Sequence, residues 1–351
     1  QKDPVCREME GGFCKVTFCV HIPTGRKCVL KQTKEAWTKM ERSFNREIEV
    51  LAKYQHPAIV PFVGFAFLKK GKKGNIYLER ISNGTLCEFI KRCKSEPRPQ
   101  FDHTHKLIIA YGISCAMEYL HIHRILHRDL KTDNILLDDE LQPYLFDFGT
   151  SVSQDSDFEI NSTVSQTTVT IMAPEFLESF EAYNRTLPID VFSYAMVLYE
   201  LITENPPYPP NATAALIVSN IYDGKRPSFP DDTDPKWSDL IERCWSQDPS
   251  KRPTFKEICE LLESDKFLTP DIDASAFQKY KEKVRPASKD SITELREKSE
   301  KGDAESQNLY GLHLYSGIGV ERNVEESRKL FESSAKGGSG DGSLFYSILL
   351  Q

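Results

Sequence analysis

The chain has 351 residues, of which 39% are hydrophobic and 28% are charged, and its formal net charge is -7. This length predicts one large domain plus a smaller part, and the composition excludes an intrinsically disordered chain. The acidic balance argues against nonspecific binding to nucleic acid. The longest apolar run, residues 58–68, is too short to cross a bilayer, so no membrane segment is expected here.

Nine cysteines are scattered along the chain without the paired spacing of a metal site. This usage is typical of free thiols in a reducing compartment and predicts a cytoplasmic protein. Because the chain begins with glutamine rather than methionine and stops inside a helical pattern, we expect it to be a fragment of a longer protein.

Alternating apolar and polar residues on both sides of a turn at 23–26 predict a β-hairpin over residues 13–33. Residues 37–54 repeat apolar side chains every three or four positions, which predicts a helix with one apolar face. That face is formed by Met40, Phe44, Ile48 and Leu51. Another strand is expected at 75–80, after a lysine-rich turn.

A buried helix is predicted at 102–123, and it leads into a stretch of charged residues between apolar runs at 125–149. Transfer of a phosphoryl group concentrates negative charge on oxygen atoms. A catalyst therefore needs carboxylates that hold metal ions, cations, and a carboxylate that orients the acceptor hydroxyl. The stretch supplies all three, in His127, Arg128, Asp129, Lys131, Asn134 and Asp147.

Residues 149–173 are rich in serine and threonine without regular periodicity, which predicts a loop. A strongly apolar helix is expected at 191–203, capped by Asp190, and Thr254 with Glu257 predicts a capping box on a later helix. After Phe267 the composition turns charged and irregular, which predicts a linker with one short helix near 276–283. Two helical patterns over 303–337 follow, separated by a glycine-containing turn, and 290–301 forms another.

Three motifs resemble the signatures of protein kinases. They are His-Arg-Asp-x-Lys-x-x-Asn at 127–134, Asp-Phe-Gly at 147–149 and Ala-Pro-Glu at 173–175. Trp245 and the run at 251–255 are similar to the tyrosine-kinase-like group. The resemblance implies an α+β, two-lobed kinase fold over residues 1–268, with an antiparallel sheet and one helix in the first lobe and a mostly helical second lobe. A linker at 269–288 and a helical repeat region at 289–351 would follow.

The resemblance also implies ATP and Mg²⁺ as cofactors and protein substrates as partners. Asp129 would orient the acceptor hydroxyl and Lys131 would face the transferred phosphate. Asn134 and Asp147 would hold magnesium, and Asn134 would complete the catalytic group. Asp190 matches the family's residue that supports the catalytic-loop backbone, and Glu175 would form a buried ion pair with Arg252.

Lys31 would grip the α and β phosphates of ATP and would be held by Glu47. The expected ATP-binding residues are Gly11, Gly12, Val16, Val29, Lys31, Glu47, Leu78, Glu79 and Ile81. The chain departs from the family in the glycine-rich loop, where Met9 and Cys14 stand at the first and third glycine positions. Side chains there should weaken contact with ATP before they affect the chemistry.

The expected activation segment contains Ser162, Thr163, Ser165, Thr167 and Thr168. A phosphate on one of the first four would pair with Arg128 and order the segment, although a merely polar surface loop is the alternative. Thr168 stands where the family has a threonine that contacts Asp129 and Lys131. Together with Lys131, it favours serine and threonine as acceptors.

Residues 303–337 resemble one Sel-one-like repeat, a relative of the tetratricopeptide hairpin, although an unrelated helical hairpin is the alternative. One hairpin cannot bury its own apolar face, so we expect either further repeats in the full protein or packing of this one on a neighbour. Protein partners are expected to bind through the repeats. The resulting hypothesis is an active serine/threonine kinase with a partner-binding repeat module. The alternatives are a pseudokinase scaffold without catalysis, and a protein whose repeats are the main functional surface.

Overall fold

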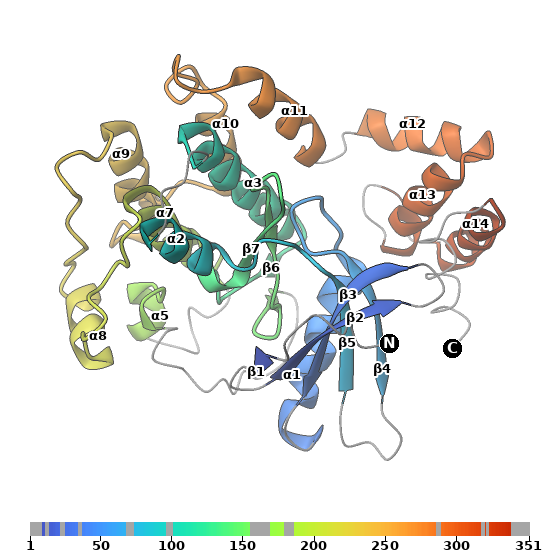
Figure 1. Cartoon of the computed structure of the whole chain (residues 1–351), viewed down its shortest axis with the longest axis horizontal. Coiled ribbons are helices and arrows are strands. Elements are labelled where there is room, and N and C mark those ends of the chain that lie inside the picture. The colour runs from blue at the N-terminus through green and yellow to red at the C-terminus, as the bar shows by residue number, and fades with distance from the viewer. Residues whose placement is uncertain are drawn as a thin grey trace. The chain divides into compact units, whose positions relative to one another are not determined.

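The computed structural model describes residues 9–10, 14–21, 25–33, 37–67, 74–95, 101–154, 169–178, 186–285, 289–316, 320 and 323–337 (Figure 1). The chain divides into two compact units. The first contains residues 1–55, 61–80 and 286–351, and the second contains residues 56–60 and 81–285.

A five-stranded antiparallel sheet lies in the first unit, with strand order β1-β2-β3-β5-β4. The strands are β1 (Met9–Glu10), β2 (Cys14–His21), β3 (Arg26–Thr33), β4 (Phe62–Phe67) and β5 (Gly74–Glu79). β2 and β3 form the predicted hairpin, in which Val16 lies opposite Lys31. Gly25 in its turn has φ +69°, a left-handed conformation that glycine adopts without steric cost.

Helix α1 (Trp37–Lys53) packs against β4 and β5 of this sheet (Figure 1). Its apolar face is buried at Phe44 and Leu51, as the periodicity predicts. The Phe44 ring lies so close to Gly74 that a Cβ on Gly74 would be 2.3 Å from the ring. β5 therefore begins with a residue that has no side chain.

Three further helices of the first unit are α12 (Lys289–Glu300), α13 (Ala304–Ser316) and α14 (Val324–Lys336). They lie where the sequence predicts them. Tyr310 and Leu314 of α13 are buried, and the partly buried Val320 and Leu330 pack against them.

The second unit is mostly helical. Its helices are α2 (Leu86–Ser95), α3 (His103–Ile122), α5 (Pro174–Glu178), α7 (Pro188–Thr203), α8 (Ala214–Tyr222), α9 (Pro235–Cys244), α10 (Phe255–Leu262) and α11 (Ala274–Val284). β6 (Ile125–Leu126) pairs with β9 (Val152–Ser153), and β7 (Ile135–Leu137) pairs with β8 (Pro143–Leu145). None of the helices in the described ranges is long and apolar enough to cross a membrane.

The helix ends of this unit follow capping chemistry, with one correction to the sequence prediction. Asp102 caps α3, and Thr254 with Glu257 forms the predicted capping box on α10. α7, however, begins at Pro188, so Asp190 lies inside its first turn and does not cap it. Proline is well suited to the first helical position because its fixed φ is already helical and its missing N–H needs no partner there.

The region predicted as a linker contains α11, which packs on α3 as part of the second unit. Phe277, Tyr280 and Val284 are fully buried. Tyr280 lies against Gly112 of α3, where a Cβ would be 2.1 Å from the Tyr280 Oη. The prediction missed this docking because it depends on a glycine in a distant helix, which local composition does not reveal.

His56 ties the turn after α1 to the end of α11. Its Nε2–H donates to the Val284 carbonyl at 2.8 Å, and its Nδ1 accepts the Ala58 N–H at 3.1 Å. Burial lowers the pKa of His56 to about 4, although the hydrogen bond to Val284 acts in the opposite direction. The ring is therefore neutral at pH 7.

We predict that Gly112→Ala destabilises the protein, because its Cβ would overlap the Tyr280 hydroxyl and Pro143. Overpacking costs about 1–3 kcal/mol, against about 1 kcal/mol that alanine gains over glycine in a helix. Urea unfolding measures the difference. Tyr280→Phe is the control: it removes a buried hydroxyl that has no hydrogen-bond partner among the described residues, so stability should be unchanged or higher. Wild-type stability of Gly112→Ala would contradict the close contact.

His56 should make stability depend on pH. Its folded pKa lies below the ordinary 6.5, so its contribution is complete above about pH 6.5 and is lost as the pH falls toward 4. Between pH 7 and pH 5 the wild type should lose about 2 kcal/mol more unfolding free energy than His56→Gln, since each pH unit in this window is worth about 1.4 kcal/mol. Urea unfolding at both pH values tests this, and equal losses in the two proteins would rule it out.

Candidate active site

The loop between β6 and β7 is anchored by Asp190 of α7, which is fully buried. Its carboxylate accepts the backbone N–H groups of His127 at 2.9 Å and Arg128 at 2.8 Å, and His121 Nε2 at 3.0 Å. Burial alone would raise the pKa of Asp190, but the hydrogen bond and charge of His121 lower it below its ordinary value. The carboxylate is thus ionised and holds the loop backbone.

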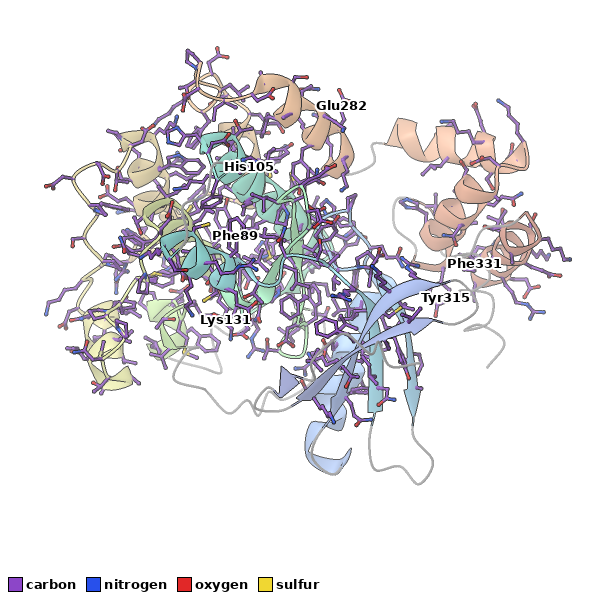
Figure 2. All side chains as sticks on the ribbon, viewed as in Figure 1. Phe89, His105, Lys131, Glu282, Tyr315 and Phe331 are labelled. Atoms are coloured by element: carbon purple, nitrogen blue, oxygen red, sulfur yellow. The ribbon has the colours of Figure 1, made fainter. Side chains whose placement is uncertain are left out.

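Asp129 lies at the centre of this loop and is 8% exposed. Its Oδ2 accepts from Lys131 Nζ at 2.7 Å and from Asn134 Nδ2 at 2.8 Å, and its backbone carbonyl accepts from the same Asn134 nitrogen at 2.7 Å. Its Oδ1 is buried and has no hydrogen-bond partner in the part of the chain that the structure describes. One oxygen is therefore held while the other can accept a proton donor. Figure 2 labels Lys131 among the side chains.

Asp147 follows β8 and has φ 64°, a left-handed conformation unusual for a residue with a side chain. The next residue, Phe148, is fully buried, and its ring centroid lies 5.0 Å from that of His127. Burial also lowers the pKa of His127, whose ring is therefore neutral at pH 7. Arg128 has φ 67°, so the backbone is left-handed beside Asp129 as well.

In the first unit, Lys31 of β3 pairs with Glu47 of α1. The Nζ to Oε distances are 2.7 and 2.8 Å, and Glu47 is buried. The expected ion pair is therefore present. A strand lysine tied to a buried carboxylate on a neighbouring helix has a fixed position, which a free surface lysine lacks.

Other residues expected to bind ATP lie on the same sheet or just after it. Val29 lies opposite Leu78 in the register of β3 and β5, and Leu78 is buried. The Glu79 side chain accepts from Arg26 at 2.5 Å. Ile81 follows β5 and belongs to the second unit.

Several predicted site residues lie outside the described residues. They are Gly11, Gly12, Ser162, Thr163, Ser165, Thr167 and Thr168. Met9 begins β1 and Cys14 begins β2, so the two positions that depart from glycine lie at strand ends.

The predicted ion pair between Glu175 and Arg252 is confirmed. It is bidentate, with N to O distances of 2.7 and 2.8 Å, and both side chains are buried. Arg252 also donates to the carbonyl oxygens of Pro188 and Ser246. Each nitrogen of this buried guanidinium thus donates to at least one acceptor, which is the condition under which a buried ion pair is tolerated.

Residues 10–262 match the protein kinase domain family. The chain belongs to this family. The matched range includes the polar residues described above, among them Lys31, Glu47, Asp129, Asn134 and Asp147. The domain match ends at the end of α10, before α11.

Named relatives of this kinase domain are serine/threonine kinases. Serine/threonine/tyrosine-protein kinase HT1 of Arabidopsis thaliana is 37% identical over 248 residues, which cover 70% of this chain and 58% of HT1. Serine/threonine-protein kinase STY17 of the same plant is 35% identical over 224 residues, or 64% of this chain and 37% of STY17. A probable serine/threonine-protein kinase of Dictyostelium discoideum is 38% identical over 233 residues, which cover 65% of this chain and 16% of that relative. The chain thus spans less than two thirds of each relative.

The polar groups of the kinase domain suit a magnesium ion that is shared with a nucleotide. In the described part of the chain, no group of three or more His, Cys, Asp and Glu side chains could hold a metal ion by itself. Mg²⁺ usually binds one or two protein oxygens together with phosphate oxygens. The Asn134 amide nitrogen is used by Asp129, which leaves the amide oxygen for a metal.

Sequence reasoning missed one contact of the kinase domain. Thr132, in the 3-10 turn Thr132–Asn134, donates its hydroxyl to Glu200 of α7 at 2.7 Å. The available signal was Glu200 itself, an acidic residue inside the apolar pattern of residues 191–203. Its partner could not be identified from that pattern.

We predict that Asp190→Asn lowers the unfolding free energy by about 1.5–3 kcal/mol, the range for hydrogen bonds to a charged group. The amide cannot accept from two N–H groups and His121 without turning its NH₂ toward a donor. Asp234→Asn is the matched control, because Asp234 is an exposed cap of α9 and asparagine caps equally well. Urea unfolding should separate the two variants; equal losses would show that the buried acceptor is not required.

Proposed function

We propose that this kinase domain transfers the γ-phosphate of ATP to serine and threonine hydroxyls of proteins. The observation that carries the proposal is the Asp129 carboxylate, held at Oδ2 by Lys131 and Asn134 with no hydrogen-bond partner among the described residues at Oδ1. An acceptor hydroxyl that donates to Oδ1 would be oriented for attack and would lose its proton to the same group.

The other steps of phosphoryl transfer need a cation near the phosphate and oxygen ligands for magnesium, and the site contains side chains of both kinds. Lys131 would face the transferred phosphate, and Asn134 and Asp147 would bind Mg²⁺. Magnesium supplies charge neutralisation on the phosphate oxygens when it is bound. The left-handed backbone at Asp147 and the buried Phe148 behind it support a defined direction for the Asp147 carboxylate.

ATP would be bound through Lys31, oriented by Glu47, and through Val16, Val29 and backbone groups near Leu78, Glu79 and Ile81. Gly11 and Gly12 would approach the phosphates. Since Met9 and Cys14 replace two glycines of that loop, we infer a weakened affinity for ATP with the chemistry intact.

Lys131 and Thr168 favour serine and threonine over tyrosine as acceptors. The names of STY17 and of the Dictyostelium relative agree with this, whereas the name of HT1 also includes tyrosine. Phosphorylation of Ser162, Thr163, Ser165 or Thr167 would order the activation segment by pairing with Arg128. Arg128 lies directly before Asp129, so such a pair would act next to the reacting group.

We further infer that α13 and α14 form a Sel-one-like repeat that recruits protein partners. A Cβ on Gly311 would lie 2.9 Å from the Phe331 ring, and one on Gly337 would lie 2.8 Å from the Ala304 Cβ. Small residues at close approaches between helices are expected of such a repeat. Figure 2 labels Phe331 on α14.

A cytoplasmic location is part of this proposal. Cys115 and Cys259 are not joined by a disulfide, although their sulfur atoms lie only 3.7 Å apart. Thiols this close that stay reduced fit a reducing compartment.

The alternative function is a pseudokinase scaffold that binds partners without catalysis. The altered glycine-rich loop favours it. Loss of catalysis usually removes the lysine, the base or the metal-binding aspartate, and this chain retains Lys31, Asp129 and Asp147. The retained groups favour the active enzyme.

We predict ATP- and Mg²⁺-dependent transfer of phosphate to a generic serine/threonine protein substrate. Asp129→Asn should reduce kcat by about 10²–10⁴-fold, the usual contribution of a positioned base. Lys31→Met should also abolish transfer, because the phosphates lose their anchor. Omitting magnesium should have the same effect.

The control is thermal unfolding of each variant, which should resemble that of the wild type. Activity in Asp129→Asn equal to that of the wild type would disprove the assignment. Absence of transfer from folded protein phosphorylated on its activation segment would favour the scaffold. A high KM for ATP in an active wild type would support the weakened glycine-rich loop.

A further inference from the structure

The loop that carries Asp129 is attached to α7 at two points. Asp190 accepts the N–H groups of His127 and Arg128, and Glu200, ten residues later on the same helix, accepts the hydroxyl of Thr132. Ten residues of helix span about 15 Å. Asp129 and Lys131 lie in the segment between the two points.

The second attachment is short and shielded from solvent. Thr132 is 3% exposed, and its Oγ1 lies 2.7 Å from Glu200 Oε2. This distance is typical of a hydroxyl that donates to a charged carboxylate. Threonine also has a stiff χ1, so its hydroxyl direction and its backbone position are coupled.

The groups around Glu200 shift the pKa of its carboxyl group in opposite directions. The net pKa of Glu200 is raised above its ordinary value, with burial as the largest cause. The charge of Asp133 also raises it, whereas the hydrogen bond from Thr132 and the charges of Lys91 and Lys94 lower it. A carboxylate in this setting gains more from one well-placed donor than a surface carboxylate does, because burial weakens the competition from water.

Thr132 connects directly to the groups that hold Asp129. It follows Lys131, which donates to Asp129 Oδ2, and it opens the 3-10 turn that ends at Asn134, which donates to the same oxygen. The turn has no side-chain cap of its own, since Lys131 occupies the cap position without a capping hydrogen bond. The Thr132 to Glu200 bond is therefore a side-chain anchor of this turn.

We propose that Glu200 and Thr132 are positioning residues for phosphoryl transfer: their hydrogen bond sets the Thr132–Asn134 turn, and through it the direction of the Asp129 carboxylate. This inference rests on the proposed kinase activity. Neither residue touches the reacting atoms. Their loss should therefore lower kcat and leave ATP binding unchanged, since small displacements of a reacting group cost much in rate.

The test compares Thr132→Val, Thr132→Ser and Glu200→Gln with the wild type in steady-state phosphate transfer. Valine keeps the shape of threonine without the hydroxyl, and should lower kcat about 10-fold with the KM for ATP changed less than about 2-fold. Serine restores the hydroxyl and should recover most of the activity. Glutamine keeps an acceptor but not the charge, so Glu200→Gln should fall between them.

Thr203→Val is the matched control. Thr203 lies on the same helix three residues beyond Glu200. Its hydroxyl donates to the Tyr199 carbonyl at 2.8 Å and accepts from the Asn205 N–H at 3.1 Å, and neither partner belongs to the catalytic loop. Its kcat should equal that of the wild type. The double variant Thr132→Val with Glu200→Gln should lose no more activity than Thr132→Val alone, because Glu200→Gln changes only a bond that Thr132→Val has already removed.

Three results would overturn the proposal. The first is an unchanged kcat in Thr132→Val. The second is a variant with a lower melting temperature but wild-type kcat per folded molecule. The third is a raised KM for the protein substrate with unchanged kcat, which would place Glu200 in substrate binding. An assay of Asp129→Asn in parallel distinguishes a failure of the positioning role from a failure of the proposed kinase activity. If the wild type exceeds Asp129→Asn while Thr132→Val equals the wild type, only the positioning role is wrong.

Discussion

A carboxylate removed from solvent is stable only where donors surround it, and Asp190 meets this condition by accepting two consecutive backbone N–H groups and a histidine. The same condition fixes the catalytic loop, because the donors are its own backbone. α7, which carries Asp190, is apolar around most of its circumference and lies in the core of the second unit. A loop rich in charged residues is therefore oriented by a helix whose side chains are mostly buried.

The match to the protein kinase family ends at residue 262, but the next helix, α11, is also packed into the second unit. Tyr280 of α11 packs against Gly112 of α3. The carbonyl of Val284, the last residue of α11, accepts a hydrogen bond from His56, which follows α1 in the chain. Chain termini of a domain often lie free at its surface. Here residues 274–284 supply buried aromatic side chains to the core, so the physical domain is longer than the family's common region.

Local patterns were sufficient to predict much of this protein. The alternation of β2 and β3, the apolar face of α1 and the capping box on α10 depend on residues a few positions apart, and the structure has them. Lys31 and Glu47 were paired through the kinase resemblance. The docking of Tyr280 on Gly112 and the bond between Thr132 and Glu200 depend on contacts between distant segments, which periodicity does not contain. The start of α7 at Pro188 has a local signal, a proline at the first helical position, and the prediction chose Asp190 instead.

The two left-handed residues beside the catalytic groups, Arg128 and Asp147, have a thermodynamic consequence. A side chain in this conformation costs about 1–3 kcal/mol, and glycine would remove that cost. The substitutions that would most relax the backbone here would thus remove the flanking cation and the carboxylate that we propose to bind magnesium. In this protein, thermal stability and the proposed phosphoryl transfer place opposite demands on the same two positions.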